Sequence, residues 1–262
     1  MHNVFLSTDS KLKQKLRRKE LTIGSWISIG NPAVAEIMAK AGFDWLTIDM
    51  EHSAITLDQA QELIRVIDLC GVVALVRVGE NNPNLIKRVM DAGAHGVIVP
   101  MVNTKDDAIK AVNAVKYPPL GTRGVGLARA QGYGLEFEKY KEWVNKESIV
   151  IVQIEHIRAV ENLESILKVE YVDAFIVGPY DLSGSLGVPG EFEHPDVKKA
   201  LKSIKNISRK FNVVSGFHVI PPDAKEVFKK IKEGYKFIGF SLDTLFLGHK
   251  CREEMGKLKL KV

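Results

Sequence analysis

Residues 149–181 read IVIVQIEHIRAVENLESILKVEYVDAFIVGPYD, in which two short apolar runs, 149–152 and 174–177, flank a segment of helical character. Runs of this length and composition are typical of strands buried in a parallel sheet. A carboxylate follows each run: Glu155 after the first and Asp181 after the second. One strand–helix unit separates them, so both are expected at the same rim of the sheet. Because two acids facing a shared space repel each other unless a proton or a cation lies between them, the stretch predicts a divalent-metal site.

The same alternation of strand and helix extends over the whole chain. Eight strand–helix units begin near residues 22, 45, 73, 96, 149, 174, 213 and 237. Right-handed parallel crossovers repeated eight times close into a barrel, and such a barrel takes about 250 residues as one domain. We therefore predict an α/β fold, a single (β/α)8 TIM barrel over residues 1–262, with a charged helix at 9–20 over its floor. A doubly wound open sheet is the alternative, but Gly24 and Gly30 do not form the glycine-rich phosphate turn that it usually needs after the first strand.

The composition is that of an ordinary globular chain, with 45% hydrophobic and 26% charged residues and a net charge of +5. The absence of a basic stripe with interleaved aromatic residues argues against nucleic-acid binding. No apolar run approaches the roughly 18 residues of a membrane span, and residues 1–6 lack the pattern of a signal peptide. The two cysteines, Cys70 and Cys251, share no metal-binding spacing and are expected to be reduced thiols. We expect a cytoplasmic protein with no membrane or nucleic-acid partner.

The reactive groups of such barrels lie at the C-terminal ends of the strands. No predicted strand ends in lysine, which argues against a Schiff-base aldolase. Glu155 and Asp181 without a third protein ligand describe an oxygen-rich site completed by water and substrate, for which Mg²⁺ or Mn²⁺ is expected. The other polar or mouth-forming residues at strand ends are Asp49, Glu51, His52, Arg77, Pro100, Met101, Gln153, His218 and Asp243.

Two of these residues have both a catalytic and a structural interpretation. His52 follows the second strand directly and is a candidate general base, because histidine exchanges protons near neutral pH; a lone histidine is more often structural. Arg77 lies in an otherwise apolar strand, where an unpaired guanidinium is costly to bury. It either stabilises a substrate oxyanion or forms a structural ion pair with Asp49 or Glu51.

The longest step between strands contains residues 118–134, PPLGTRGVGLARAQGYG. Its glycines and its two arginines, Arg123 and Arg129, indicate either a mobile loop that approaches a ligand or a packed loop or oligomer contact. The pattern leaves both alternatives open.

Taken together, the motifs resemble those of the HpcH/HpaI class II aldolases, a family that includes 2,4-dihydroxyhept-2-ene-1,7-dioate aldolase and 2-dehydro-3-deoxyglucarate aldolase. The resemblance covers nearly the whole chain from Gly24 onward. The matching segments are LTIDMEH (46–52), VRVGENNPNLIKRVMDAGAHGVIVPMV (76–102), YPPLGTRGVG (117–126), VQIE (152–155), VEYVDAFIVGPYDLSGSLG (169–187) and GFSLDT (239–244).

The resemblance implies a metal-dependent barrel enzyme that cleaves a 4-hydroxy-2-oxo acid reversibly to pyruvate and an aldehyde. By position, Glu155 and Asp181 would hold Mg²⁺ or Mn²⁺, with Co²⁺ also possible. Gln153, Gly178, Tyr180 and Asp181 would bind the pyruvate part. His52 would be the base with Asp91 as its partner, and Arg77 would stabilise the developing oxyanion.

The resemblance also implies a homo-oligomer, a hexamer built as a trimer of dimers, in which the C-terminal helix packs on a neighbour or is swapped with it. One departure is Tyr180, at a position where related sequences usually have a small residue. Two other functions remain: a related metal-dependent enolate enzyme acting on phosphoenolpyruvate or an acyl-CoA ester, and a barrel without catalysis. The second predicts loss of His52, Arg77, Glu155 or Asp181, and all four are present.

Overall fold

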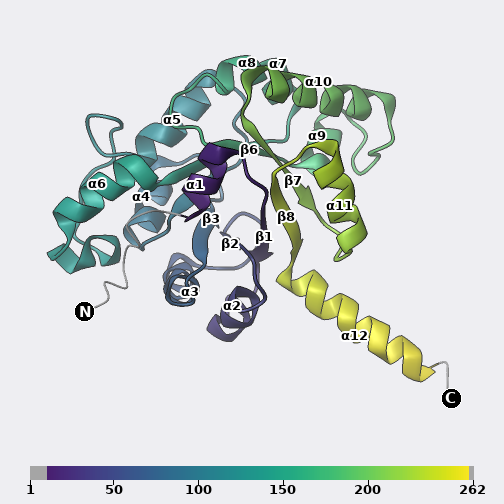
Figure 1. The fold of residues 1–262 in the computed structure, drawn as a ribbon, viewed down its shortest axis with the longest axis horizontal. Coiled ribbons are helices and arrows are strands. Elements are labelled where there is room, and N and C mark those ends of the chain that lie inside the picture. Colours follow the sequence, from purple (N-terminus) through teal and green to yellow (C-terminus); the bar gives the residue numbers. More distant parts are fainter. Residues whose placement is uncertain (1–10, 260–262) are drawn as a thin grey trace.

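The computed structural model describes residues 11–259, and it is a closed barrel of eight parallel strands in the order β1 to β8 (Figure 1). The predicted (β/α)8 barrel is therefore confirmed. Residues 1–6, in which we see no signal-peptide pattern, lie outside the described residues. The strands are β1 (Thr22–Ile27), β2 (Trp45–Asp49), β3 (Val73–Arg77), β4 (Gly96–Val99), β5 (Ile149–Ile154), β6 (Ala174–Val177), β7 (Val214–Val219) and β8 (Phe237–Leu242).

Helices surround the barrel, and their starts follow the capping signals of the sequence. Asn31 and Asn82 cap helices whose first residue is proline, and Thr56 and Thr104 each form a capping box. The helices are α1 (Lys11–Arg18), α2 (Pro32–Ala39), α3 (Leu57–Leu69), α4 (Pro83–Asp91), α5 (Lys105–Val115), the 3₁₀ turn η1 (Arg129–Gly134), α6 (Phe137–Glu147), α7 (Ile157–Glu161), α8 (Leu163–Ile166), α9 (Pro179–Ser185), α10 (Pro195–Phe211), α11 (Ala224–Glu233) and α12 (Asp243–Lys259).

Helix α1 closes the floor of the barrel, in agreement with the charged helix predicted there over residues 9–20. Leu12 and Leu16 are buried against the inward-facing residues of the strands. The Nζ atom of Lys13 donates to Asp173 Oδ1 at 2.5 Å and to the Ser148 carbonyl at 2.9 Å, which ties α1 to the segments that precede β5 and β6. With the floor sealed, the opposite end of the barrel is the end available to a ligand.

Large aromatic side chains fill the middle of the barrel. Trp45 and Phe237 stack with ring centroids 4.2 Å apart. A Cβ on Gly24 would lie 1.9 Å from the Trp45 ring, so glycine is required there for the indole to fit. A second cluster, between the strands and the outer helices, contains most of the remaining apolar residues.

The long step between β4 and β5 differs from the sequence prediction in one respect, because it contains η1 and α6, which were not predicted. Arg123 donates to Asp91 Oδ1 at 2.5 Å and to the Tyr140 hydroxyl at 2.9 Å, and Arg129 pairs with Asp68 at 2.7 Å. Both arginines are buried. For these two arginines, the structure therefore supports the interpretation of residues 118–134 as a packed loop.

Helix α12 extends away from the barrel (Figure 1). Its apolar residues Leu247, Met255 and Leu258 are exposed. Among residues 11–259, no helix is long and apolar enough to cross a membrane.

Candidate active site

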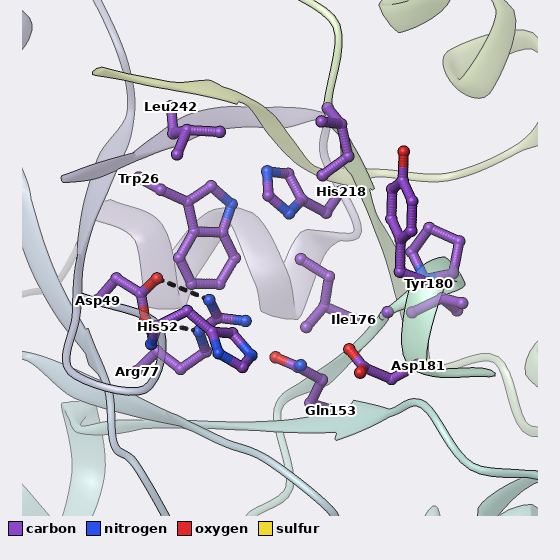
Figure 2. Close-up of a pocket in the computed structure, with 14 residues that line it drawn as sticks. Trp26, Asp49, His52, Arg77, Gln153, Ile176, Tyr180, Asp181, His218 and Leu242 are labelled. Carbon is purple, nitrogen blue, oxygen red and sulfur yellow. Dashed lines mark hydrogen bonds and ion pairs between the residues drawn. The ribbon is translucent and has the colours of Figure 1, made fainter. Parts of the chain in front are cut away.

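A cavity of about 350 Å³ opens at the carboxyl ends of the strands (Figure 2), within the range of small-molecule sites. Of the predicted strand-end residues, Asp49, His52, Arg77, Gln153, Asp181 and His218 line it, whereas Pro100 and Met101 after β4 and Asp243 after β8 do not. The lining residues are Trp26, Asp49, His52, Arg77, Gln153, Ile176, Val177, Gly178, Pro179, Tyr180, Asp181, His218, Ile220 and Leu242.

Arg77 lies on one side of this cavity and is held in a fixed orientation. Its Nε and Nη2 atoms donate to the two oxygens of Asp49 at 2.9 and 2.7 Å, and Nε lies 3.3 Å from Glu51 Oε2. Its guanidinium carbon is 4.5 Å from the centre of the Trp26 ring, a cation–π contact. Burial alone would raise the pKa of Asp49, but the hydrogen bonds and charge of Arg77 outweigh it and keep this pKa low. The structural ion pair is therefore present, and it leaves the Nη1 group of Arg77 without a partner in the described chain.

Four carboxylates surround Arg77 and the base of the cavity: Asp49 and Glu51 in contact with Arg77, and Glu155 and Asp181 farther across. Burial raises the pKa of Glu155, and the charge of Asp181 adds to this rise. Burial also raises the pKa of Glu51 to about 7; Arg77 opposes the rise, while Glu155, Asp49 and Asp181 add to it. Glu51 Oε2 has no hydrogen-bond partner. One guanidinium thus faces four acids, and this excess of negative charge and oxygen donors fits a hard divalent cation.

The metal ligands that the sequence predicts are two protein carboxylates, Glu155 and Asp181. Among the described residues no group of three or more His, Cys, Asp or Glu side chains is arranged to hold a metal ion. Glu155 and Asp181, the donor pair that the sequence predicts, would therefore need oxygens from water or substrate to complete a coordination shell.

Glu155 is positioned by its neighbours and lies behind the lining of the cavity. The Met101 backbone N–H donates to Glu155 Oε1 at 2.7 Å, and Gln153 Nε2 donates to Glu155 Oε2, so Gln153 and Glu155 point to the same side of the sheet. Met101 has a φ of 53°, an uncommon conformation for a residue with a side chain. The strained backbone turns the amide toward Glu155.

Gly178 leaves the space that Glu155 occupies. A Cβ at this position would lie 2.9 Å from Glu155 Oε2 and 3.4 Å from Gln153 Nε2. We expect Gly178→Ala to displace the carboxylate and to weaken Mn²⁺ binding by about tenfold or more, as loss of positioning contacts does at metal sites. Titration with Mn²⁺ measures this, with Gly184→Ala as control because a Cβ there meets nothing. Equal affinities of the Gly178 variant and the wild type would contradict it.

Asp181 lies in the first turn of α9, next to Tyr180 and after the Pro179 that begins the helix. The first amide groups of a helix have no partner within it and are available to an anion. Tyr180 is half exposed, and its ring meets Phe192 edge-on at 4.9 Å. The structure therefore places Gln153, Gly178, Tyr180 and Asp181 together on one side of the cavity.

His52 lines the mouth of the cavity with an exposed side chain. Its backbone N–H donates to Asp49 Oδ1 at 3.2 Å, and its Nε2 is 3.8 Å from Glu51 Oε2. Figure 2 shows the imidazole beside Arg77, away from Asp181. His52 and Arg77 thus face Asp181 across the cavity.

The structure does not bring Asp91 to this site within one chain. Asp91 is the last residue of α4, which runs antiparallel to the strands and ends at the floor. It accepts from Arg123 at 2.5 Å and from Gln131 at 3.2 Å. Asp243 is also outside the lining: it accepts from the backbone N–H groups of Ser28 and Ile29, at 2.9 and 2.8 Å, and anchors the loop after β1.

Trp26, Ile220 and Leu242 were not among the predicted site residues. Trp26 occupies an inward position of β1, and the sequence signal that could have indicated it was a tryptophan at the next-to-last position of a barrel strand. Leu242 faces the cavity because of an irregularity in β8 that no sequence pattern indicates. These residues form the wall between β7, β8 and β1, together with His218.

Comparison with known proteins agrees with this geometry. The model of the HpcH/HpaI aldolase/citrate lyase family matches residues 22–249. A 2-keto-3-deoxy-L-rhamnonate aldolase from Klebsiella pneumoniae subsp. pneumoniae is 39% identical over 246 residues, covering 93% of this chain and 90% of that protein.

Solved structures of the same family are also similar. An HpcH/HpaI aldolase/citrate lyase family protein from Burkholderia cenocepacia has a TM-score of 0.90 at 34% identity, covering 95% of this chain and 99% of that one. An HpcH/HpaI aldolase from Desulfitobacterium hafniense has a TM-score of 0.86 at 32% identity, with 95% and 96% covered. The chain belongs to the HpcH/HpaI aldolase/citrate lyase family.

Proposed function

We propose that this class II aldolase, a carbon–carbon lyase, cleaves 4-hydroxy-2-oxo acids reversibly to pyruvate and an aldehyde. The observation that carries the proposal is the arrangement of one cavity: Asp181 and Gln153 on one side, with Glu155 behind Gln153, and Arg77 with His52 on the other. Curated relatives are named 2-keto-3-deoxy-L-rhamnonate aldolase. A 2-keto-3-deoxy sugar acid with a 4-hydroxyl group is itself a 4-hydroxy-2-oxo acid, so we propose substrates of this class for the present chain.

Class II aldolases of this family depend on a divalent metal. Glu155 and Asp181 would hold it here, and their all-oxygen donor set favours Mg²⁺ or Mn²⁺, with Co²⁺ as a further possibility. When bound, such an ion polarises the 2-oxo group and stabilises the negative charge that develops on the pyruvate half.

The side chains of the cavity would divide the remaining work. Gln153 and the first amide groups of α9, at Tyr180 and Asp181, bind the carboxylate end of the substrate. His52 removes the proton of the 4-hydroxyl group as the C3–C4 bond breaks. The partnerless Nη1 group of Arg77 stabilises the charge on the oxygen at C4, in an orientation that Asp49 and Trp26 already fix.

The role of Asp91 as a partner of His52 stays a prediction. Because Asp91 ends α4 at the barrel floor and pairs with Arg123, it can reach a His52 only in another copy of the chain. We propose the family's trimer of dimers, and the projecting α12 with its exposed Leu247, Met255 and Leu258 fits packing on a neighbour. A mass in solution near that of six copies of the 29.2 kDa chain tests this. Cys70 and Cys251 are free thiols, which agrees with the cytoplasmic location we propose.

The function is tested by pyruvate release from a panel of 4-hydroxy-2-oxo acids. The matched control is the same 2-oxo acid without the 4-hydroxyl group, which has no proton for the base to remove and must remain uncleaved. Pyruvate from the hydroxylated acids alone supports the aldol reaction. A folded protein that releases no pyruvate from any member contradicts it.

His52→Ala is expected to lower kcat for cleavage by about a hundredfold or more, the typical contribution of a general base. Pyruvate affinity should change little, because the groups assigned to pyruvate are Gln153 and the first amide groups of α9, and His52 is not among them. Steady-state kinetics with pyruvate as a product inhibitor measures both quantities. An unchanged kcat would remove His52 from the role of base.

A further inference from the structure

The imidazole of His218 lies in a part of the cavity that the proposed mechanism does not use. The groups assigned to pyruvate come from the ends of β5 and β6, and those assigned to the breaking bond come from β2 and β3. The remaining wall consists of Trp26 from β1, His218 and Ile220 from β7 and its end, and Leu242 from β8. Figure 2 shows the His218 ring directed into the cavity between Trp26 and Tyr180. Within the described chain, His218 is the member of this wall with a hydrogen-bond acceptor atom in its side chain.

The β8 strand fixes which ring nitrogen of His218 carries the proton. His218 Nε2 lies 3.4 Å from the Ser241 carbonyl oxygen. A carbonyl oxygen can only accept, so this contact requires a proton on Nε2. Nδ1 of the neutral ring is then an acceptor, and it has no partner among the described residues.

An irregularity in β8 directs that carbonyl. Between the pairs Gly24–Gly239 and Trp26–Leu242, β8 has one residue more than β1. The φ of Ser241 is 51°, and its hydroxyl donates to the Ile220 carbonyl at 2.9 Å, which holds the unusual backbone in place. Bulges of this kind often redirect groups beside active sites. Gly239 completes the arrangement, because a Cβ there would lie 2.9 Å from Trp26 Nε1 and 3.5 Å from His218 Cδ2.

The surroundings also keep the ring neutral. Burial lowers the pKa of His218 to about 3, and the nearby charge of Arg77 adds to this decrease. The ring packs on Trp26 with centroids 5.0 Å apart. A neutral imidazole with a fixed tautomer is a directional acceptor and not a cation.

We propose that His218 is a specificity-determining residue whose Nδ1 accepts a hydrogen bond from a hydroxyl group on the aldehyde half of the substrate. The inference rests on the proposed function, and it adds the chemical class of the aldehyde, a hydroxyaldehyde. When the aldehyde carries only an alkyl chain, Nδ1 loses its contact with water and gains no hydrogen bond. The cost of this unpaired acceptor lowers kcat/KM for such a substrate. An aldehyde with a carboxylate places a negative charge against the lone pair, and the neutral ring cannot compensate for it.

The test compares two substrates that differ by one hydroxyl group, 4,5-dihydroxy-2-oxopentanoate and 4-hydroxy-2-oxopentanoate, which yield pyruvate with glycolaldehyde or acetaldehyde. Wild-type kcat/KM is expected to be about tenfold higher for the dihydroxy acid, the size of one hydrogen bond. His218→Leu should bring the ratio close to one, and His218→Gln, whose amide oxygen can accept, should restore part of it. Ile220→Val, on the same wall without a polar atom, should keep the wild-type ratio.

A wild-type ratio near one, or a His218→Leu ratio equal to that of the wild type, would overturn the proposal. The wild-type comparison needs no variant, so it stands even where His218→Leu does not fold. Deuterium exchange into the methyl group of pyruvate, followed with metal present, reports the enolate chemistry without any aldehyde. If deuterium exchange occurs but the enzyme shows no preference for the dihydroxy acid, only the role of His218 is refuted. If neither exchange nor cleavage occurs, the proposed function is refuted, and the inference with it.

Discussion

Glu155→Gln is expected to reduce metal-dependent pyruvate release by about a thousandfold or more, since a metal ion contributes several kcal/mol to stabilising charge in the transition state. The substitution preserves the shape of a buried side chain but removes its charge. Its amide oxygen can still accept from Met101 N–H, as Glu155 Oε1 does at 2.7 Å. Its NH₂ group would then face Gln153 Nε2, which is also a donor. The site loses a ligand charge and a hydrogen bond together.

The barrel of this variant should remain folded. Glu155 is buried among the carboxylates of Asp181 and Glu51, and its removal relieves repulsion in the metal-free protein. Thermal unfolding of the metal-free variant is therefore expected at the wild-type temperature or above it. Glu161→Gln, at an exposed glutamate at the end of α7, is the matched control and should retain full activity. Wild-type turnover by Glu155→Gln in metal-treated buffer would refute the metal assignment.

Arg77→Lys is expected to lower kcat for cleavage by about a hundredfold to a thousandfold, the cost of losing a preorganised donor to an oxyanion. Lysine keeps the charge but cannot reproduce the paired contacts to Asp49 at 2.9 and 2.7 Å, nor the planar contact with Trp26. Lysine and arginine are not interchangeable at such a site. The Nη1 group that faces the substrate would be lost together with its support.

This prediction separates the two interpretations of Arg77 that the sequence left open. If Arg77 acts on the oxygen at C4, cleavage falls far more than deuterium exchange into the methyl group of pyruvate, which involves no C4. If Arg77 is only a structural ion pair, both rates change together and by a small factor. Arg65→Lys, at a surface arginine paired with Glu62, is the control for the substitution itself.

The barrel and most of the site were predictable from local patterns. The starts of all eight strands lie within one residue of their predicted positions, because short apolar runs with a polar residue at the exit are a strong signal of parallel barrel strands. The convergence of His52, Arg77, Gln153 and Asp181 then follows from topology, since all parallel strands end at the same rim.

Contacts between distant residues were less predictable. Asp91 and Arg123 are 32 positions apart, and nothing local indicates that this arginine holds that carboxylate at the floor. Helix α6 was missed although Tyr140, Trp143, Val144 and Glu147 recur at helical spacing on its buried side. The role of His218 depends on a one-residue irregularity in β8, which changes the direction of a carbonyl group without leaving a pattern in the sequence.

Metal-dependent aldol cleavage is the central claim, and one measurement tests it most directly. Pyruvate release from a 4-hydroxy-2-oxo acid is followed after chelation and again after addition of Mg²⁺, Mn²⁺ or Co²⁺. We predict no release after chelation and recovery with at least one of these ions, with Glu155→Gln inactive throughout. Release that persists in the chelated enzyme, or a folded protein that binds Mn²⁺ but forms no pyruvate with any ion, would contradict the account. The second result would favour an enolate enzyme that acts on phosphoenolpyruvate or an acyl-CoA ester.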